Sequence, residues 1–207
     1  MSEPNSRRGR GRPKTFDSVR ALDLAIDTYW RDGVEVVSLN EICRRAGISK
    51  PGLYREFGGE DQFMSAALER YAARVLAPGL AGLEDNTEFA PAVDSLLAHL
   101  TRDATMTMPS GCLFVSMRSA PWRMGPATRA VVDQVSKCCL MAYSAWFARL
   151  SDHGAIALPV PLDVAASYLD AQVTWLTIQA SSGVAPELVR AHGRLALGAL
   201  NSGQRPG

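Results

Sequence analysis

Apolar residues recur every three or four positions along most of this chain, which is the period of amphipathic helices. In residues 16–60 this period marks three short helices. The first is predicted to begin after Asp17, whose side chain can cap it, and to end by Gly33. The second begins near Leu39, and the third follows Ser49. No stretch alternates apolar and polar residues as a half-buried strand does, so the pattern predicts an all-α fold.

Residues 38–57 contain the second and third of these helices, separated only by a tight turn. Ser38 and Glu41 have the spacing of a capping box, in which each side chain accepts a backbone N–H that the helix leaves free. Apolar residues follow along one face at i, i+3, i+4 and i+7: Leu39, Ile42, Cys43 and Ala46. Gly47 can take the left-handed conformation that ends a helix, and Ser49 can cap the next one. This arrangement predicts a helix-turn-helix.

The second helix of such a motif presents its N-terminal residues to base edges, while the first crosses the phosphate backbone. Lys50 can donate to phosphate or guanine, and the Tyr54 hydroxyl can donate to phosphate. Arg55 can form two parallel hydrogen bonds with either group. Leu53 and Phe57, four positions apart, are predicted to face inward. The other interpretation is an ordinary helical hairpin whose charged side chains are only solvated.

Residues 1–15 hold several basic side chains among glycines and prolines, with Glu3 as their only acidic neighbour. Because this composition offers little apolar surface to bury, it predicts a disordered basic arm. Arginines on such an arm enter narrow minor grooves, so Arg10, Arg12 and Lys14 are predicted DNA contacts. The other interpretation is a solvated tail without a partner.

The first third of the chain, roughly residues 15–76, resembles the TetR family of one-component transcriptional regulators. The matching segments are residues 21–33, 38–42, 46–54 and 57–58. The resemblance implies that the second and third helices read DNA, that the fourth links them to a ligand-binding domain, and that a small effector releases the DNA. Matched position by position, it implies these DNA contacts: Ser38, Asn40, Ser49, Lys50, Pro51, Gly52, Tyr54 and Arg55.

Two places depart from the family pattern. Glu56 stands where a histidine is common. Gly59, Glu60 and Asp61 occupy a stretch where the family often has a lysine that touches phosphate from the start of the fourth helix. The basic arm is the candidate replacement for that contact.

Residues 61–207 are predicted to form a helical effector-binding and dimerisation domain after a DNA-binding domain at 16–60. The apolar period predicts helices at about 60–76, 91–105, 126–150, 163–182 and 186–200. Residues 79–90 are interpreted as a connection, and Asp163 as a helix cap. The last two helices are the predicted dimer interface, four helices packing across a two-fold axis. Burial of these helices within one chain's own core is the other interpretation.

Gly111-Cys112-Leu113 is a weaker second point of resemblance, because some TetR-type proteins have a similar Gly-Cys-Leu at the start of a central helix. Aromatic and methionine side chains favour ligand cavities. On this ground the candidate effector contacts are Phe114, Met117, Trp122, Trp146 and Trp175. Plain core positions are an equally good interpretation of these residues.

The 207 residues are 47% hydrophobic with a net charge of +1, which is enough apolar material for one or two small domains. Residues 1–57 carry 11 basic against 8 acidic residues, so the basic excess lies with the predicted DNA-binding part. No apolar run is long enough to cross a membrane or serve as a signal peptide, which predicts a cytoplasmic protein without a membrane partner. The four cysteines and three histidines lack zinc-ligand spacing, so we expect no metal and no cofactor.

Three functions follow from these observations. The first is a ligand-responsive transcriptional regulator, expected to be a repressor. It would bind a pseudo-palindromic double-stranded DNA operator as a homodimer and be released by a small apolar or aromatic effector. The second is a redox- or electrophile-sensing regulator built on Cys112, Cys138 or Cys139. The third, an all-helical enzyme, has no support, because the chain lacks a phosphate-binding glycine loop, a Gly-x-Ser-x-Gly motif and paired carboxylates with metal-ligand spacing.

Overall fold

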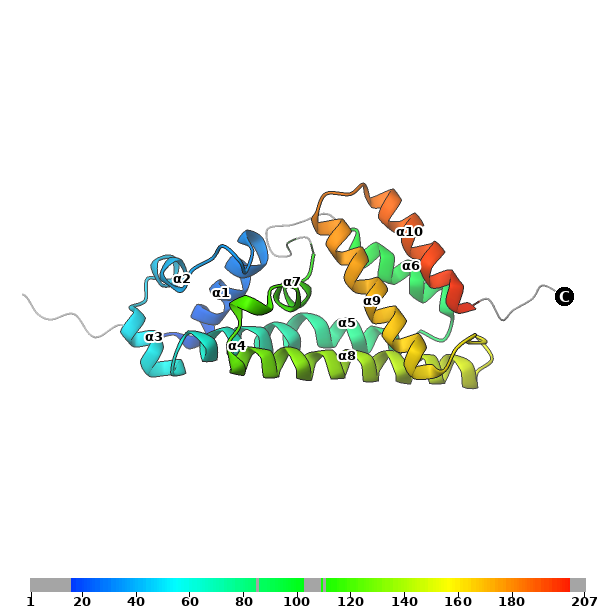
Figure 1. Ribbon diagram of the computed structural model, residues 1–207, viewed down its shortest axis with the longest axis horizontal. Helices are drawn as coiled ribbons and strands as arrows, with labels where there is room; N and C mark the ends of the chain where they lie inside the picture. The colour runs from blue at the N-terminus through cyan, green and yellow to red at the C-terminus, as the bar shows by residue number, and fades with distance from the viewer. Residues whose placement is uncertain (1–15, 85, 103–108, 110, 202–207) are drawn as a thin grey trace, which may run out of the picture.

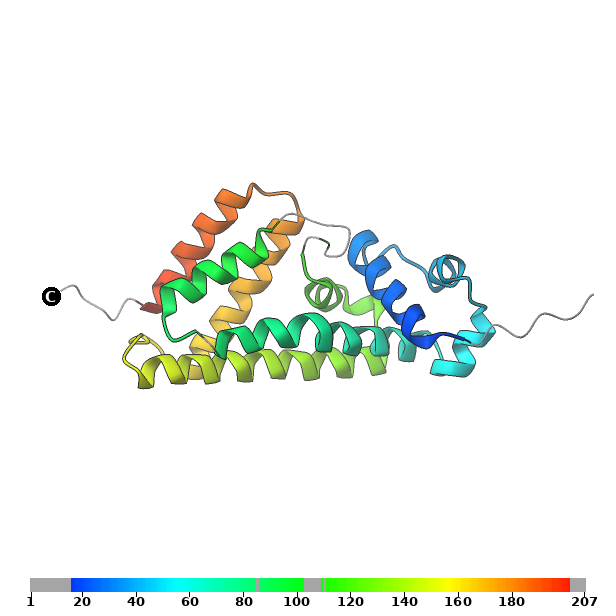
Figure 2. The ribbon, with the colours of Figure 1, turned by 180° about the vertical axis from the view of Figure 1, so that it is seen from behind.

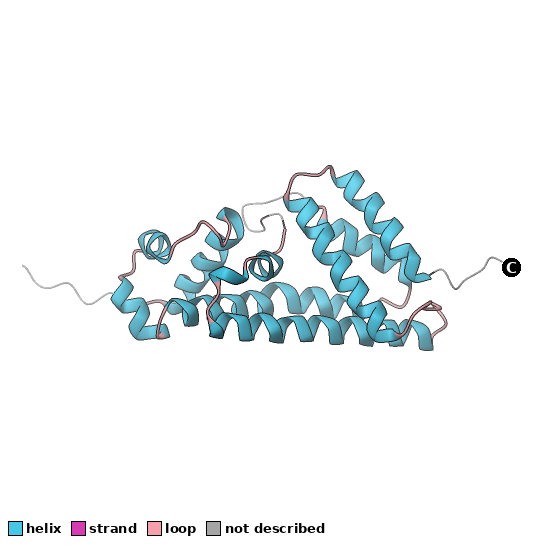
Figure 3. Cartoon of the chain, in the orientation of Figure 1, coloured by secondary structure: helices cyan, strands magenta, loops and turns pink. Residues whose placement is uncertain are grey.

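The computed structural model describes residues 16–84, 86–102, 109 and 111–201. Every regular element among these residues is helical, which confirms the all-α prediction (Figure 3). The helices run as follows: α1 Ser18–Asp32, α2 Leu39–Ala46, α3 Lys50–Phe57, α4 Glu60–Tyr71, α5 Ala77–Glu84, α6 Phe89–Leu100, α7 Leu113–Ser119, α8 Pro126–Asp152, α9 Leu162–Ser181 and α10 Pro186–Gly198. Short 3-10 turns at Pro121–Arg123 and Ala199–Asn201 follow α7 and α10.

The molecule is elongated, with α1, α2 and α3 gathered at one end (Figure 1). Helices α4 and α5 continue one another along the length of the molecule, and α8 runs beside them, as both views show (Figures 1 and 2). Helices α6, α9 and α10 form the opposite end, and α7 lies between the two groups. We call α1–α3 the head and the part from α5 onward the effector domain, with α4 joining them.

The fourth helix extends further than its sequence pattern predicts, because Pro78 does not end it. A proline ring clashes with the carbonyl four residues earlier and supplies no N–H. A π-helical turn over Ala72–Leu76 precedes Pro78, and there the Ala77 N–H donates to the Ala72 carbonyl. This wider turn lets the chain remain helical to Glu84, so the connection predicted at residues 79–90 is wrong over its first half.

Helix α8 begins at Pro126, as the sequence predicts. Val132, Cys139 and Tyr143 are buried, whereas Cys138 is exposed. At the start of α9, Pro161 is the N-cap and Asp163 lies inside the first turn, so the predicted Asp163 cap is also wrong. An acidic residue in the first turn still interacts favourably with the helix dipole, which explains why Asp163 occurs near this helix start.

Candidate DNA-reading head and effector cavity

Caps and turns fix the head locally, as the sequence predicts. The Asp17 carboxylate accepts the Arg20 N–H at 3.0 Å at the start of α1. The Ser38 hydroxyl accepts the Glu41 N–H at 3.2 Å, and the Ser49 hydroxyl accepts the Gly52 N–H at 3.2 Å. Gly47 ends α2 with φ of 64°, a conformation that glycine adopts without strain. The two helices are therefore joined as a helix-turn-helix.

Only half of the predicted capping box forms, because the Glu41 side chain binds arginines. Its carboxylate accepts from Arg44 at 2.6 and 2.8 Å and from Arg45 at 2.6 Å. These hydrogen bonds, from Arg44 first, lower the pKa of Glu41 to about 2. Arg45 also reaches Asp32 at the end of α1, at 2.5 Å. The charges of Arg44 and Arg45 are thus matched by acidic groups within the head.

Cations at the tip of α3 lack such partners. Among the described residues, neither Lys50 nor Arg55 forms an ion pair, and both are exposed. The Lys50 ammonium lies 5.7 Å from the centre of the Tyr54 ring, whose residue is 39% exposed. Glu56 is exposed too and makes no ion pair with Arg55. The tip therefore presents positive charge and a phenol to solvent on a single short helix.

Most of the predicted DNA contacts share this exposure, and Gly52 differs. The exposed ones are Ser38, Asn40, Ser49, Lys50, Pro51, Tyr54 and Arg55. Gly52 is buried, and a Cβ there would lie 3.0 Å from the Ser49 hydroxyl and 3.6 Å from the Phe16 ring. Its absent side chain lets the start of α3 pack against Phe16. The predicted contacts Arg10, Arg12 and Lys14 lie outside the described residues.

The acidic start of α4, one of the departures from the family pattern, faces the effector domain. The Asp61 carboxylate accepts the Ala127 N–H at 2.8 Å and the Thr128 N–H at 3.1 Å. It also accepts the Thr128 hydroxyl at 2.7 Å. Burial by itself would raise the pKa of Asp61, but these hydrogen bonds from Thr128 and Ala127 outweigh it and lower the pKa. Asp61 therefore caps the N-terminus of α8 from another helix.

A second contact joins the effector domain to the head. Arg123, in the turn after α7, donates to the backbone carbonyls of Val34 and Val37 at 3.2 and 3.1 Å. These carbonyls belong to the loop between α1 and α2, directly before the helix-turn-helix. Helix α1 itself is bound by Arg70 of α4, which donates twice to the Asp23 carboxylate at 2.8 Å. The head is thus held to the rest of the chain at several separate points.

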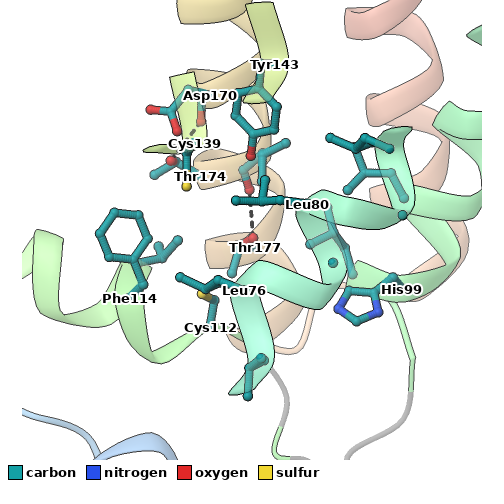
Figure 4. Close-up of a pocket in the computed structure, with 18 of the residues that line it drawn as sticks. Leu76, Leu80, His99, Cys112, Phe114, Cys139, Tyr143, Asp170, Thr174 and Thr177 are labelled. Carbon is teal, nitrogen blue, oxygen red and sulfur yellow. Dashed lines mark hydrogen bonds between the residues drawn. The ribbon is translucent and has the colours of Figure 1, made fainter. Parts of the chain in front are cut away.

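A cavity of about 300 Å³ lies between the α4–α5 segment and helices α6 to α9, mostly lined by the effector domain. Apolar side chains form most of its wall, among them Leu76, Leu80 and Phe114 (Figure 4). Trp30 of α1 also lines it, so the head itself contributes to the wall. Its volume is at the lower end of the range for small-molecule sites.

Of the five predicted effector contacts, Phe114 lines the cavity and the other four do not. Met117 is fully buried in the core, and Trp146 packs against Phe89 with ring centres 5.8 Å apart. Trp122 and Trp175 are 67% and 43% exposed on the outer surface. The prediction rested on residue type, and large apolar residues serve core and surface as readily as cavities.

The polar residues of the cavity wall were not predicted from the sequence. Arg118 of α7 forms an ion pair with Asp170 of α9 at 2.9 Å, and both line the cavity with Tyr143 of α8. Nothing in the spacing of these residues connects them, because they come from three helices. The sequence offers one related signal, because Tyr143 carries a polar group at a buried position of α8.

The four cysteines occupy three different environments. Cys43 is buried in the head, where burial raises the pKa of its thiol, and Cys138 is exposed on α8. Cys112 and Cys139 both line the cavity. Burial raises the pKa of Cys139 to about 12. Cys112 accepts a hydrogen bond from the Tyr71 hydroxyl at 3.3 Å.

Within the part of the chain that the structure describes, no helix combines the length and apolar character needed to span a bilayer. The same residues contain no cluster of three histidine, cysteine or acidic side chains able to hold a metal ion.

Comparison with known proteins relates the head to one family. Residues 21–67 match the profile described as "Bacterial regulatory proteins, tetR family". Over 112 residues the chain is 32% identical to the HTH-type transcriptional repressor ComR of Escherichia coli (strain K12). That match spans 53% of this chain and 53% of ComR, about half the length of each.

Solved structures extend the likeness to nearly the whole chain. A cysteine mutant of the TetR family transcriptional regulator CifR, complexed with a 26-base-pair operator DNA, superposes with a TM-score of 0.73 at 25% identity. The match covers 92% of this chain and 100% of CifR. The reduced form of NemR from E. coli, at 21% identity and a TM-score of 0.68, shares the fold over 86% of this chain and 96% of NemR.

Proposed function

This chain belongs to the TetR family of bacterial regulatory proteins, and on that premise we propose that it is a repressor released by a small effector. It binds a pseudo-palindromic DNA operator as a homodimer and acts as a regulator rather than an enzyme. The observation that carries the proposal is the contrast between cations in the head. Arg44 and Arg45 are paired with Glu41, whereas Lys50 and Arg55 are exposed and without an ion pair among the described residues. Lys50 at the start of the recognition helix and Arg55 in its last turn are thus available to phosphates and guanine.

The remaining DNA contacts are assigned by their position on the same surface. Ser38, Asn40 and Ser49 are exposed at the starts of α2 and α3, where hydroxyl and amide groups can donate to phosphate. Arg10, Arg12 and Lys14 precede the head in the sequence, and we include them as groove or phosphate contacts. Each phosphate they neutralise would add about −0.9 to the slope of log affinity against log salt concentration. CifR, which shares this fold, has been solved with a 26-base-pair operator DNA, and this supports operator binding by the present chain.

An apolar surface on α9 and α10 supports the homodimer. Val164, Trp175 and Ile178 of α9 are between 42% and 48% exposed, and Leu188 and Leu195 of α10 are 49% and 80% exposed. They lie at helical spacing, so each helix turns an apolar face to solvent. Surfaces of this kind mark association sites, and a two-fold axis would pair them in a four-helix interface.

The contacts between the two domains supply a route from effector to DNA. A dimer presents its two recognition helices at a fixed spacing of about 34–36 Å or a multiple of it. Asp61 ties α4, which leads out of the head, to α8, and Arg123 ties the turn after α7 to the loop between α1 and α2, so a shift of α8 or of this turn would move the head. An effector that binds better in the shifted state would lower operator affinity, and operator DNA would weaken the effector equally.

Footprinting on the DNA upstream of the protein's own gene tests the proposal. We expect the wild-type protein to protect two half-sites. Lys50→Ala should weaken operator binding by at least about fivefold, because it removes a direct contact to phosphate or base. Lys137→Ala, which removes an equally exposed lysine from α8, is the matched control and should leave affinity unchanged. Equal affinities for the two variants would remove α3 from the DNA surface.

Cysteine-based sensing is a second candidate, favoured by the position of Cys112. Its sulfur lines the cavity and accepts the Tyr71 hydroxyl, so a small oxidant or electrophile that enters the cavity would meet it. Under this candidate, oxidation releases the operator from the wild type and from the Cys138→Ser control, but not from Cys112→Ser. Release that persists in Cys112→Ser and in Cys139→Ser would contradict it.

A further inference from the structure

The Tyr143 hydroxyl is a polar group of the cavity wall that has no hydrogen-bond partner among the described residues. The residue is only 7% exposed, and its hydroxyl points from α8 into the cavity (Figure 4). It makes no hydrogen bond with any residue that the structure describes. Because this hydroxyl opens onto the cavity and has no described protein partner, its hydrogen bond has to come from a ligand or water.

Other tyrosines of the chain show how unusual this is. The Tyr71 hydroxyl, in the same cavity, donates to the Cys112 sulfur and accepts the Leu113 N–H, both at 3.3 Å. The Tyr168 hydroxyl donates to the Ala196 carbonyl at 3.0 Å. Tyr29 also has a buried hydroxyl without a partner, but it lies in the head and does not line the cavity. Of the two tyrosines that line the cavity, Tyr143 is therefore the one whose hydroxyl has no partner among the described residues.

The chemistry of this hydroxyl favours a ligand that accepts a hydrogen bond. Burial, followed by the neighbouring Cys139 and Asp170, raises the pKa of Tyr143, so the phenol keeps its proton. Cys139 beside it keeps its proton as well, because burial raises the pKa of that thiol to about 12. Neither group is an anion that could bind a cationic ligand.

The charged groups nearest to Tyr143 balance one another. Arg118 is paired with Asp170 at 2.9 Å, donates to the Thr174 hydroxyl, and lies 5.3 Å from the centre of the Phe114 ring. A ligand carboxylate would face Asp170, and a ligand ammonium would face Arg118, each without compensation. The second cation of the wall, Arg102, donates to the His99 backbone carbonyl at 3.0 Å, forms no ion pair with a described residue, and has a buried Nε without a partner among them. Burial, and then Arg102, lower the pKa of His99, so this residue adds no charge at neutral pH.

The volume and the lining of the cavity indicate the size and polarity of the ligand. A cavity of about 300 Å³ with a mostly apolar wall suits a compact apolar body. We propose that the effector is an uncharged molecule with an apolar body of one or two rings and one oxygen acceptor, a hydroxyl or a carbonyl, and that Tyr143 donates a hydrogen bond to this oxygen. The inference rests on the proposed function in one respect, that this cavity is the effector site.

A matched ligand series tests the inference by calorimetry on the full-length protein. Naphthalene has no acceptor, 2-naphthol and 2-acetylnaphthalene carry a hydroxyl and a ketone, and 2-naphthoate carries a charge. We expect the alcohol or the ketone to bind about five- to tenfold more tightly than naphthalene, the factor that one neutral hydrogen bond supplies. Tyr143→Phe should abolish this preference and leave naphthalene unchanged. Tyr29→Phe, which removes the other unpartnered hydroxyl, should leave all the affinities unchanged.

Thermal unfolding of the free protein separates a ligand contact from a structural one. Because the Tyr143 hydroxyl has no protein partner, Tyr143→Phe should leave the unfolding midpoint equal or raise it. Tyr71→Phe is the matched comparison and should lower the midpoint, since the Leu113 N–H then loses its acceptor. A midpoint lowered as much by Tyr143→Phe as by Tyr71→Phe would assign Tyr143 a structural role and overturn the inference.

The binding results decide the rest. Equal binding of naphthalene and its oxygenated forms, tightest binding of 2-naphthoate, binding of no uncharged member, or a preference that survives Tyr143→Phe would each overturn the inference. In those cases an intact operator footprint that another compound still releases would leave the proposed function standing. Conversely, Tyr143-dependent binding that never releases the operator would support this ligand site and contradict the effector-released repressor.

Discussion

The head and the effector domain satisfy their polar side chains in different ways. In the head, most partners are close in sequence: Ser38 with Glu41, Ser49 with Gly52, and Glu41 with Arg44 are each three residues apart. The effector domain has such local pairs too, for example Thr101 with Leu97, but it adds side-chain partners far apart in sequence, with Arg118 and Asp170 52 residues apart and Arg194 and Asp94 100 apart. A shape fixed by local contacts persists when its surroundings move, whereas one fixed by distant contacts changes when a ligand alters the packing. The head is therefore suited to act as a rigid reader, and the effector domain as the part that responds.

In the proposed homodimer each head has its complete fold but needs the head of the partner copy for high operator affinity, so Leu195→Glu should have the largest effect. A charge placed on the exposed apolar face of α10 should convert the dimer to a monomer, because burying it there is unfavourable. Operator affinity should then fall by about 10²–10⁴-fold, since one head loses the second half-site. Analytical ultracentrifugation and operator titration measure the two effects. Met141→Glu, on the exposed side of α8, is the control and should alter neither. A dimeric Leu195→Glu protein would move the interface away from α10.

Arg123→Ala should loosen the tie between the rigid reader and the responsive domain. The change removes two hydrogen bonds from a charged group to the Val34 and Val37 carbonyls, worth about 1.5–3 kcal/mol each where they are well formed. We expect operator binding to persist and the factor by which an effector weakens it to shrink. Operator titrations with and without 2-naphthol measure that factor. Arg129→Ala, which removes an exposed neighbour bonded to Pro121, should retain the wild-type factor. An unchanged factor in Arg123→Ala would leave α4 as the sole connection.

Asp61→Asn should give the smallest effect, with a characteristic dependence on pH. The loss of an ionised cap on α8 should lower the free energy of unfolding by about 0.5–2 kcal/mol at neutral pH. Because folding lowers the pKa of Asp61, its contribution is present above the usual value of 3.8 and is lost as pH falls through the lower folded pKa. The wild-type advantage in chemical denaturation should therefore be constant from about pH 5 to 8 and disappear at lower pH. A constant difference across the whole range would mean that the carboxylate charge contributes nothing.

The head could be predicted from sequence because its determinants are local. The caps at Asp17, Ser38 and Ser49 and the turn at Gly47 each depend on residues within four positions, and all are present in the structure. Gly52 is the exception, since its packing against Phe16 joins residues that no local pattern relates. The family resemblance then supplied the DNA-reading role, which local physics alone leaves open between a reader and a solvated hairpin.

The cavity could not be predicted in the same way. Its polar wall combines Arg118, Tyr143 and Asp170 from three helices, and helical periodicity says nothing about which faces of separate helices meet. Periodicity also failed at Pro78, where a π turn accommodates a residue that ordinarily ends a helix. Four of the five predicted effector contacts lie outside the cavity wall for a related reason. Burial and aromatic character are shared by core and cavity, and only the tertiary packing separates them.

The most direct test of the account is reciprocal binding. The affinity of 2-naphthol for the wild-type protein is measured by calorimetry in the absence of operator DNA and again at saturating operator. We expect operator DNA to lower the affinity for 2-naphthol by the same factor by which 2-naphthol lowers the affinity for the operator. The two factors are equal because both molecules shift the same conformational equilibrium of the protein. A ligand affinity that operator leaves unchanged, measured on protein that binds both partners, would contradict the coupling between cavity and head.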